Sequence, residues 1–508
     1  MGHTLILPAL AATAAMLGAT AARAAVPPAA TLFETSCANL AGSAGAGALS
    51  GAKTRLSAEP GQPVFCELSG VLSPAPGSRI GVVYRLPLEW NGKLVGFGGG
   101  GWAGDVRLQT ALPALAKGYA VMQTDGGHPG ADGADASWSV LSKGRPNEAA
   151  LTDFIWRAVH ETAVQGKAVA RTFYGRPQTR AYFQGCSTGG RMGLTEVQRF
   201  PDDFDGVIAG APVLDLVVQT SALMRTQFFH KDPQSNLTPE QLPVVNQAVL
   251  ASCDKLDGAA DGIVADPTAC RWDPAALQCK AGETGASCLT PKQVATVRNA
   301  YRGYTTRDGR VAAWPLMRGG ELDWLTRSVG NPRMPLGSNA LTGSRGIQYL
   351  VYADPDYDLN QWDPEKDLAA VRGGAFAKQY EAIEADIRPF LRKGGKLILW
   401  HGGYDPGPSP LGTLAYYNAV RQATGAAADT GVRLFMAPGV YHCGGGPGPD
   451  RFDMLSALDA WVETGTPPAS VVATRSDGKL SRPLCPYPEQ ARYGGGDMAL
   501  AESFRCRP

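Results

Sequence analysis

The stretch Tyr182–Arg191, YFQGCSTGGR, stands where an apolar run ends and a helical pattern begins. Within it, Gly185 to Gly189 reads GCSTG, the one match to G-x-S-x-G in the chain. Small residues around a serine allow a sharp turn from strand to helix that lifts the hydroxyl out of the sheet edge. The following helix points its N-terminus at the same place, which favours developing negative charge. The stretch predicts a serine nucleophile at Ser187; a glycine-rich turn without chemistry is the alternative.

The segments around this turn indicate an α/β fold with a largely parallel sheet. Short apolar runs such as GVVYRLP, KLVGFGG, YAVMQTD, RAYFQGCS and FDGVIAGAP are separated by the helical pattern TDFIWRAVHETAVQGKAVARTFY, as in βαβ units. The pattern breaks over residues 213–393, which are rich in Pro, Trp, Arg and Cys, and resumes with GKLILWHGGYD and VRLFMAPGVYHC. We therefore predict a sheet domain formed by residues 25–212 and 394–508, with residues 213–393 inserted as a second domain.

Charge and the N-terminal residues limit the function classes. The chain has 47 basic and 46 acidic residues among 508, so nothing favours nucleic acid or an anionic membrane as a partner. Residues 1–24 end in Ala22-Arg23-Ala24 after an apolar stretch, which predicts a signal peptide and a secreted or periplasmic protein. No later run approaches the roughly 18 apolar residues of a membrane span, so we expect no membrane contact after cleavage. The oligomeric state is not predictable from these features.

A serine nucleophile of this kind requires a histidine base and a carboxylate, which follow it in the order Ser, Asp/Glu, His. His442 follows the strand-like run RLFMAPGVY and has acids upstream, whereas His401 lies at the end of its own strand. Asp405 comes just after LILWHGG, at the carboxyl end of a predicted strand. We predict His442 as the base and Asp405 as the orienting acid, with Asp429 as the weaker alternative.

The ten cysteines are an even number, which fits disulfides in an oxidising compartment. Cys186 precedes the serine and Cys443 follows the predicted base, so a bridge between them would hold the two loops together. The alternative is that each is a small buried apolar residue. A zinc site is disfavoured because the cluster Cys253, Cys270, Cys279 and Cys288 contains no CxxC spacing and no neighbouring histidine.

Two further segments carry predicted sites. FGGGGWAG, residues 97–104, follows an early strand, and its backbone can complete an oxyanion hole with Thr188, the residue after the nucleophile. Gly100 and Gly101 are equally good candidates for the second donor.

In the insertion, DKLDGAADGI, residues 254–263, spaces three carboxylates with glycines between them, which suits Ca²⁺ although it is not an EF-hand; a solvated acidic turn is the alternative.

Together these residues resemble the tannase and feruloyl esterase family, which includes mono(2-hydroxyethyl) terephthalate hydrolases. The resemblance covers nearly all of the mature chain and rests on an ordered series of motifs: GGGGWAG, TDGGH, FIWRAVHETAVQGKAV, FQGCSTGGRMGL, RFPDDFDGVIAGAP, CDKLDGAADGIVADP, YLVYADPDYD, LILWHGGYDP and YHC. It implies an α/β-hydrolase fold with a large lid inserted between the strands that carry the serine and the acid.

The resemblance also implies residue roles. Ser187, Asp405 and His442 would be the catalytic residues, and Cys186 would bridge to Cys443. Structural Ca²⁺ would be held in the lid by the side chains of Asp254, Asp257 and Asp261 and the carbonyls of Ala259 and Ile263, with no organic cofactor. The remaining disulfides would be Cys253–Cys270, Cys279–Cys288, Cys485–Cys506 and Cys37–Cys66.

The resemblance implies a small ester of an aromatic acid as substrate. We expect a secreted serine carboxylesterase for feruloyl, other hydroxycinnamoyl or galloyl esters. The alternatives are a mono(2-hydroxyethyl) terephthalate hydrolase, a broad aryl esterase, or a non-catalytic polyphenol- or carbohydrate-binding protein. Aromatic and basic residues of the insertion are candidates for contacting a planar acid: Phe228, Phe229, Trp314, Arg318, Trp324 and Arg327. For each of them the alternative is an aromatic side chain in the core of the insertion or a solvated arginine.

Overall fold

The computed structural model describes residues 1–2, 28–230, 232–330, 335 and 337–508. The predicted signal peptide, residues 1–24, lies outside the described residues apart from the first two. Within the described ranges, no helix has the length and apolar character needed to cross a bilayer.

A nine-stranded mixed sheet forms the centre of the fold, in the order β1-β2-β3-β5-β4-β8-β9-β12-β13. Strands β1 to β3 pair antiparallel, β3 pairs antiparallel with β5, and the strands from β5 to β13 in this order are parallel. The sheet strands are β1 (Ser50–Ser57), β2 (Phe65–Leu72), β3 (Ile80–Pro87), β4 (Lys93–Phe97), β5 (Ala120–Thr124), β8 (Arg180–Cys186), β9 (Gly206–Gly210), β12 (Lys396–Gly402) and β13 (Val432–Ala437).

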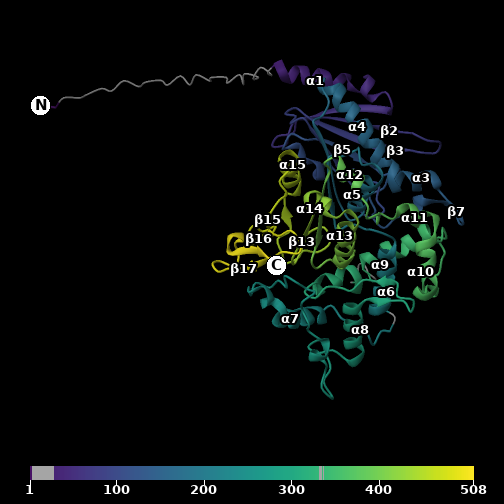
Figure 1. Cartoon of the computed structure of the whole chain (residues 1–508), viewed down its shortest axis with the longest axis vertical. Helices are drawn as coiled ribbons and strands as arrows, with labels where there is room; N and C mark the ends of the chain where they lie inside the picture. The colour runs from purple at the N-terminus through teal and green to yellow at the C-terminus, as the bar shows by residue number, and fades with distance from the viewer. Residues whose placement is uncertain (3–27, 231, 331–334, 336) are drawn as a thin grey trace.

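Helices cover both faces of this sheet (Figure 1). The helices are α1 (Pro28–Leu40), α2 (Leu108–Leu115), α3 (Glu148–Thr152), α4 (Ala158–Tyr174), α5 (Thr188–Arg199), α6 (Val217–His230), α7 (Gln241–Cys253), α8 (Pro291–Arg302), α9 (Ser338–Arg345), α10 (Pro364–Gly373), α11 (Ala375–Tyr380), α12 (Arg388–Arg392), α13 (Pro410–Thr424), α14 (Ala426–Gly431) and α15 (Met454–Thr464). Short helical turns are η1 (Ala44–Ala46), η2 (Ser137–Ser139), η3 (Asp153–Arg157), η4 (Asp254–Asp257), η5 (Pro274–Leu277), η6 (Glu321–Asp323), η7 (Leu325–Val329), η8 (Gly346–Val351), η9 (Leu359–Gln361) and η10 (Ala501–Ser503).

The strand side chains alternate between two cores. Phe183, Val207 and Leu399 belong to the core that α4, α5 and α13 cover, while their neighbours Tyr182 and Ile208 belong to the core that α2 and α15 cover. Because successive strand residues point to opposite faces, a strand buried on both sides reads as a continuous apolar run. This explains the uninterrupted runs of the sequence, and it confirms the predicted α/β-hydrolase fold.

The chain between β9 and β12 contains α6 to α12 and the small hairpin of β10 (Tyr304–Thr305) and β11 (Val311–Ala313). This segment includes a core of its own, in which Val245, Val249, Val297 and Trp324 are buried. Figure 1 shows α6, α7 and α8 at the end of the molecule opposite α1 and β2. The segment, residues 211–395, is called the insertion below.

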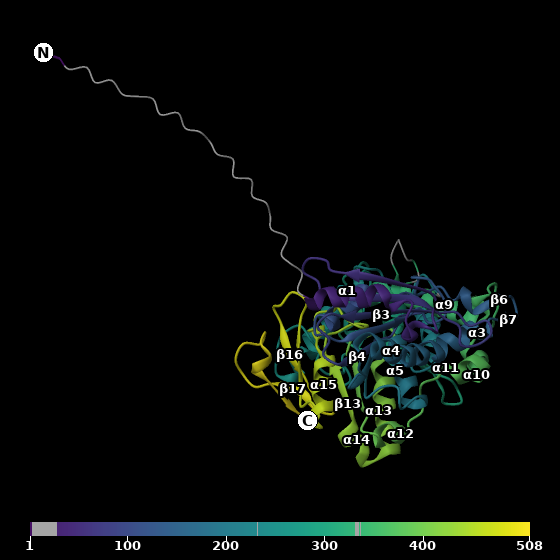
Figure 2. The ribbon, with the colours of Figure 1, turned by 90° about the horizontal axis from the view of Figure 1, so that it is seen from above.

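Small sheets and disulfides complete the structure. The C-terminal residues form β14 (Arg451–Phe452), β15 (Val471–Thr474) and β16 (Ser481–Leu484) in one sheet and β17 (Gln490–Tyr493) and β18 (Phe504–Arg507) in another, and β6 (Val140–Ser142) pairs with β7 (Arg145–Pro146). Viewed from above, β16 and β17 lie to one side of the main sheet (Figure 2). All five predicted disulfides are present, which confirms Cys37–Cys66, Cys186–Cys443, Cys253–Cys270, Cys279–Cys288 and Cys485–Cys506.

Candidate active site

Ser187 occupies a strained turn between β8 and α5. Its φ is +63° and its ψ is −124°, a backbone conformation that non-glycine residues rarely adopt. A Cβ added at Gly185 would lie 2.4 Å from the carbonyl carbon of Gly189, and one added at Gly189 would lie 2.8 Å from the carbonyl oxygen of Gly99. The two glycines of the motif are therefore required for the turn to pass this close to its neighbours.

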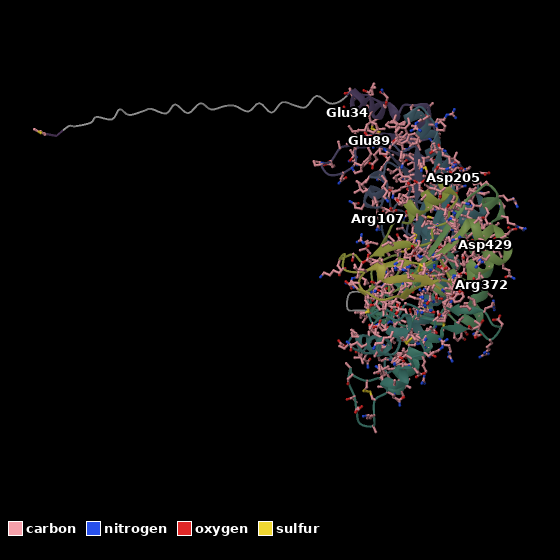
Figure 3. All side chains as sticks on the ribbon, turned by 60° about the vertical axis from the view of Figure 1, so that its left-hand side comes forward. Glu34, Glu89, Arg107, Asp205, Arg372 and Asp429 are labelled. Atoms are coloured by element: carbon pink, nitrogen blue, oxygen red, sulfur yellow. A yellow bond between two sulfur atoms is a disulfide. The ribbon has the colours of Figure 1, made fainter. Side chains whose placement is uncertain are left out.

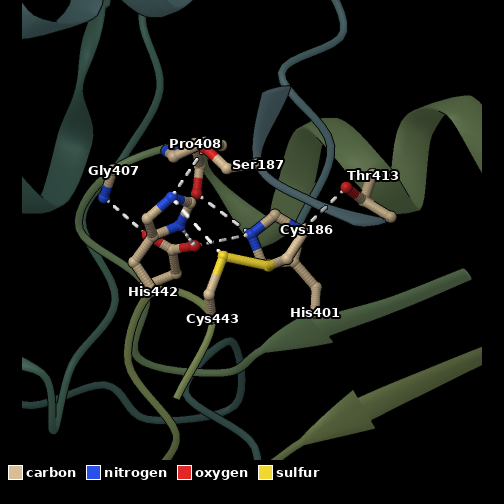
Figure 4. Close-up of a disulfide and its surroundings, with 9 residues drawn as sticks. Cys186, Ser187, His401, Gly407, Pro408, Thr413, His442 and Cys443 are labelled. Carbon is tan, nitrogen blue, oxygen red and sulfur yellow. Dashed lines mark hydrogen bonds and ion pairs between the residues drawn. A yellow bond between two sulfur atoms is a disulfide. The ribbon is translucent and has the colours of Figure 1, made fainter. Parts of the chain in front are cut away.

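Ser187, His442 and Asp405 form one chain of hydrogen bonds, although 255 residues separate the serine from the histidine. Figure 4 shows Ser187 and His442 beside each other. His442 Nε2 lies 2.9 Å from Ser187 Oγ, and His442 Nδ1 lies 2.6 Å from Asp405 Oδ2. Asp405 follows β12 and His442 follows β13, so the carboxyl ends of neighbouring parallel strands bring the three side chains together. The arrangement allows the imidazole to take a proton from the serine hydroxyl.

Asp405 is enclosed by donors. Its Oδ2 also lies 3.1 Å from His401 Nε2, and its Oδ1 accepts a 2.6 Å hydrogen bond from the backbone N–H of Gly407. Burial alone would raise the pKa of the Asp405 carboxyl, but the nearby charge of His442 and hydrogen bonds from His401 and His442 outweigh it and hold that pKa well below its usual range. Asp405 is therefore ionised at neutral pH and fixes which ring nitrogen of His442 carries a proton.

His401 was not predicted as part of the site. It is fully buried, its Nε2 faces both Asp405 and the carbonyl oxygen of Pro408, and its Nδ1 lies 2.8 Å from Thr413 Oγ1. Because both neighbours of Nε2 are acceptors, that nitrogen carries a proton. A usable signal exists in the sequence, since His401 and Asp405 are four residues apart at the end of one strand.

The weaker acid candidate, Asp429, lies elsewhere. It is an exposed residue of α14 that pairs with Arg421 at 3.1 Å, and Figure 3 shows it among the charged side chains of the molecular surface. The structure therefore places Asp405, and not Asp429, against the histidine.

The Cys186–Cys443 disulfide joins the residue before Ser187 to the residue after His442, across 257 residues (Figure 4). Cys443 itself has a φ of +61°. In the chain-entropy model, closing so long a loop contributes about 5 kcal/mol to the free energy of unfolding. The bridge also limits how far the serine turn and the histidine loop can separate.

The glycine segment after β4 separates two cavities. Gly101 and Thr188 line a cavity of about 200 Å³ together with Ser187 and His442, and the Thr188 hydroxyl donates a 2.9 Å hydrogen bond to the carbonyl oxygen of Gly101. Gly100 instead lines a larger groove of about 960 Å³, which Cys186 and Cys443 of the disulfide also line. Of the two glycines that the sequence could not distinguish, Gly101 is the one that lies beside the serine.

The smaller cavity is lined by both the sheet domain and the insertion. Trp102 and Val213 supply apolar surface, while Gln219, Asn339 and Arg225 supply polar groups. Of the aromatic and basic residues proposed to contact an aromatic acid, Arg327 lines this cavity. For Phe229 and Trp324 the alternative holds, since both are fully buried in the core of the insertion. Arg318 stacks its guanidinium on Tyr301, away from this cavity.

The acidic loop of the insertion winds tightly after α7. Asp254 Oδ1 accepts hydrogen bonds from the backbone N–H groups of Asp261, Gly262 and Ile263, at 3.1 to 3.3 Å. Asp257 Oδ1 accepts one from Ala259 N–H at 3.0 Å. Burial, and then repulsion by Asp261, raises the pKa of both Asp254 and Asp257. Two desolvated carboxylates that repel a third fit a bound divalent cation, although Arg482 already pairs with Asp261.

In sequence and in fold, the chain is similar to known esterases. The model of the family described as tannase and feruloyl esterase matches residues 66–507. The chain is 34% identical to the mono(2-hydroxyethyl) terephthalate hydrolase of Piscinibacter sakaiensis, over 87% of this chain and 85% of that protein. It is 31% identical to feruloyl esterase B of Aspergillus niger, over 87% and 86%. The crystal structure of feruloyl esterase B from Aspergillus oryzae superposes with a TM-score of 0.82 at 27% identity, covering 94% of this chain and all of that one.

Proposed function

The chain belongs to the tannase and feruloyl esterase family, and from this premise we propose that it is a serine carboxylesterase that hydrolyses esters of aromatic acids through an acyl-enzyme. That it is a carboxylic ester hydrolase follows from the family. The observation that supports serine catalysis is the hydrogen-bonded chain from Ser187 through His442 to Asp405 at the wall of a cavity.

In the first half of the proposed reaction, Ser187 Oγ attacks the ester carbonyl carbon while His442 Nε2 takes the hydroxyl proton. Asp405 keeps the proton on Nδ1 and stabilises the imidazolium. The oxygen of the tetrahedral intermediate is placed against backbone N–H groups, for which Thr188 at the start of α5 and Gly101 are the candidates; each such donor contributes about 3 kcal/mol to transition-state stabilisation. Collapse breaks the bond to the alcohol oxygen, which leaves with the proton from His442.

In the second half, water takes the place of the alcohol. His442 removes a proton from that water as its oxygen attacks the acyl carbon, and the bond to Ser187 Oγ breaks. The serine recovers its proton from His442, and the free acid is released. The disulfide beside the serine helps to keep Oγ and Nε2 within hydrogen-bond reach throughout.

The names of the relatives indicate which acyl groups to test. They are named for feruloyl esters and for mono(2-hydroxyethyl) terephthalate, both of which are esters of one-ring aromatic acids. A cavity of about 200 Å³ is small beside the roughly 300–1,000 Å³ of typical ligand pockets, which favours an acid of one ring. Feruloyl, other hydroxycinnamoyl or galloyl esters and terephthalate half-esters are therefore the substrates to compare.

The test is a comparison of initial hydrolysis rates on methyl ferulate, methyl gallate and mono(2-hydroxyethyl) terephthalate. We expect hydrolysis of at least one ester, and a preference of about 100-fold, or roughly 2.7 kcal/mol in the transition state, if the cavity is dedicated to one acid. A protein that bound these compounds but hydrolysed none, and that a fluorophosphonate did not label, would instead be a non-catalytic polyphenol- or carbohydrate-binding protein.

We also propose that the acidic loop holds a structural Ca²⁺ ion. Hard oxygen ligands suit this cation, and the side chains of Asp254, Asp257 and Asp261 with the carbonyls of Ala259 and Ile263 would supply them. The loop lies in the insertion, directly after α7 and between the two cysteines of the Cys253–Cys270 disulfide. The ion would neutralise the repelling carboxylates and stabilise the insertion, and it has no step in the ester chemistry.

Removing Ca²⁺ is therefore expected to lower the melting temperature with little effect on the reaction rate at temperatures where the protein stays folded. A ligand present at about 100 times its Kd stabilises by about 2.7 kcal/mol, which corresponds to a shift on the order of 5 °C or more. The measurement is thermal unfolding with EDTA and with EDTA overtitrated by CaCl₂, for the wild type and Asp257→Asn. An identical melting temperature under both conditions would remove the metal assignment.

We also propose that the protein is exported. Five disulfides are typical of an oxidising compartment, which agrees with the signal peptide predicted over residues 1–24. N-terminal sequencing of protein purified from periplasm or medium tests whether the chain begins after Ala24.

A further inference from the structure

Arg225 places a positive charge at the wall of the catalytic cavity. It lies on α6 of the insertion, only 2% of its surface is exposed, and it lines the same cavity as Ser187 and His442. A guanidinium in this position has little access to bulk water and depends on the cavity for its partners.

This charge lacks a protein partner. Among the described residues, the Arg225 guanidinium donates no hydrogen bond and has no carboxylate within 4 Å, and its Nε is buried without an acceptor. Other arginines nearby differ. Arg191 is also fully buried, but it donates to the carbonyl oxygens of Phe154, Ile155 and Tyr380. Arg327 of the same cavity has the carboxylate of Asp323 at 3.4 Å, a contact between opposite charges without a hydrogen bond.

Arg225 nevertheless stays charged. Burial lowers the pKa of its guanidinium to about 10, partly opposed by attraction to Asp405, so the group is protonated at neutral pH. Asp405 cannot serve as its partner, because both oxygens of that carboxylate already accept hydrogen bonds from His442, His401 and Gly407. A buried charge without a counter-charge is costly, and an anion that enters the cavity would remove this cost.

We propose that Arg225 binds an anionic substituent on the acid half of the substrate, so that the preferred esters are half-esters of aromatic dicarboxylic acids. The inference rests on the proposed function and narrows it. A guanidinium offers paired N–H donors that match a carboxylate, whereas a phenolic hydroxyl, neutral at pH 7, brings no counter-charge. We assign the anionic substituent to the acid half and not to the alcohol, because the acid half stays attached to Ser187 after the alcohol has left.

The test compares two esters that differ in one charge. Monomethyl terephthalate and dimethyl terephthalate share the ring and the leaving group, and the rate for the diester is divided by two for its two ester groups. For the wild type we expect kcat/KM to favour the half-ester by about 10- to 100-fold, as for a substrate group that pairs with a buried charge. Arg225→Gln should bring this ratio close to one by losing activity on the half-ester. Arg225→Lys should retain part of the preference for the half-ester.

Arg318→Gln is the matched control, because Arg318 is an arginine of the insertion that lines a different pocket, where it stacks on Tyr301 and donates to the carbonyl oxygen of Trp272; its charge preference should stay within about threefold of that of the wild type. Thermal unfolding checks that each variant is folded, and Arg225→Gln is expected not to lower the melting temperature. A wild type that shows no charge preference, or an Arg225→Gln variant that keeps it, would overturn the inference while leaving the esterase intact. Failure to hydrolyse methyl ferulate and both terephthalates would contradict the proposed function itself.

Discussion

Replacing Ser187 with alanine is expected to lower kcat/KM for every aromatic ester by at least about 10⁴-fold, because removing the nucleophile of a Ser-His-Asp arrangement leaves only binding and oxyanion stabilisation. The stability of the fold should hardly change. The side chain contributes one 2.9 Å hydrogen bond to His442, and alanine has to adopt the same positive φ that serine already adopts.

The measurement combines hydrolysis rates with labelling by a fluorophosphonate, which forms a bond to an activated serine. The wild type should be labelled at Ser187 and the Ser187→Ala variant should not, while both melt at the same temperature. Ser476→Ala, at an exposed position outside the residues that line the cavity, serves as the control and should keep both rate and label. Hydrolysis that survives in a folded Ser187→Ala variant would assign the reaction to another group.

The second large effect is expected at Asp405. Asp405→Asn should lower kcat/KM by about 10³- to 10⁴-fold, because an amide at this position favours the wrong tautomer of the histidine. The carboxylate accepts from Gly407 N–H with Oδ1 and faces the ring nitrogens of His442 and His401 with Oδ2. If the amide oxygen takes the bond from Gly407, the NH₂ group faces His442 Nδ1, which must then accept. The proton moves to Nε2, and Nε2 can no longer take a proton from Ser187.

Asp429→Asn provides the matched comparison. Asp429 was the other acid that the sequence allowed, and it lies exposed beside Arg421, so its replacement should change kcat/KM by less than about twofold. Both variants are assayed on the same ester, with folding checked by thermal unfolding. A folded Asp405→Asn variant within tenfold of the wild type would show that the carboxylate does not control the tautomer of His442.

The sequence allowed the central sheet to be predicted because its strands are short apolar runs with glycine or helical pattern between them, and Ser187 because its motif requires small residues on both sides. The pairing of Cys186 with Cys443 was predictable because each cysteine is adjacent to a predicted site residue. In each case the signal is local, or it joins two positions that were already identified.

The residues that were missed depend on distant parts of the chain. The proposed role of Arg225 rests on the lack, among the described residues, of a carboxylate within 4 Å of its guanidinium, and no pattern within α6 indicates this. Phe229 and Trp324 were candidates both for the substrate site and for the core of the insertion, and they fill that core, where large apolar side chains stabilise most. Composition alone does not distinguish a side chain that packs inside the insertion from one that lines the cavity.

The place of the insertion in the sheet has a consequence for how such proteins diversify. It begins after β9 and ends before β12, and these two strands pair directly, Gly206 with Lys396 through Gly210 with Trp400. The sheet therefore closes whatever the length or content of the polypeptide between them. Gln219, Arg225 and Asn339 come from the insertion, whereas Ser187, Asp405 and His442 come from the sheet domain. Exchanging this one segment between relatives would exchange part of the cavity lining while Ser187, Asp405 and His442 keep their positions, so that a change in acyl preference need not alter these three residues.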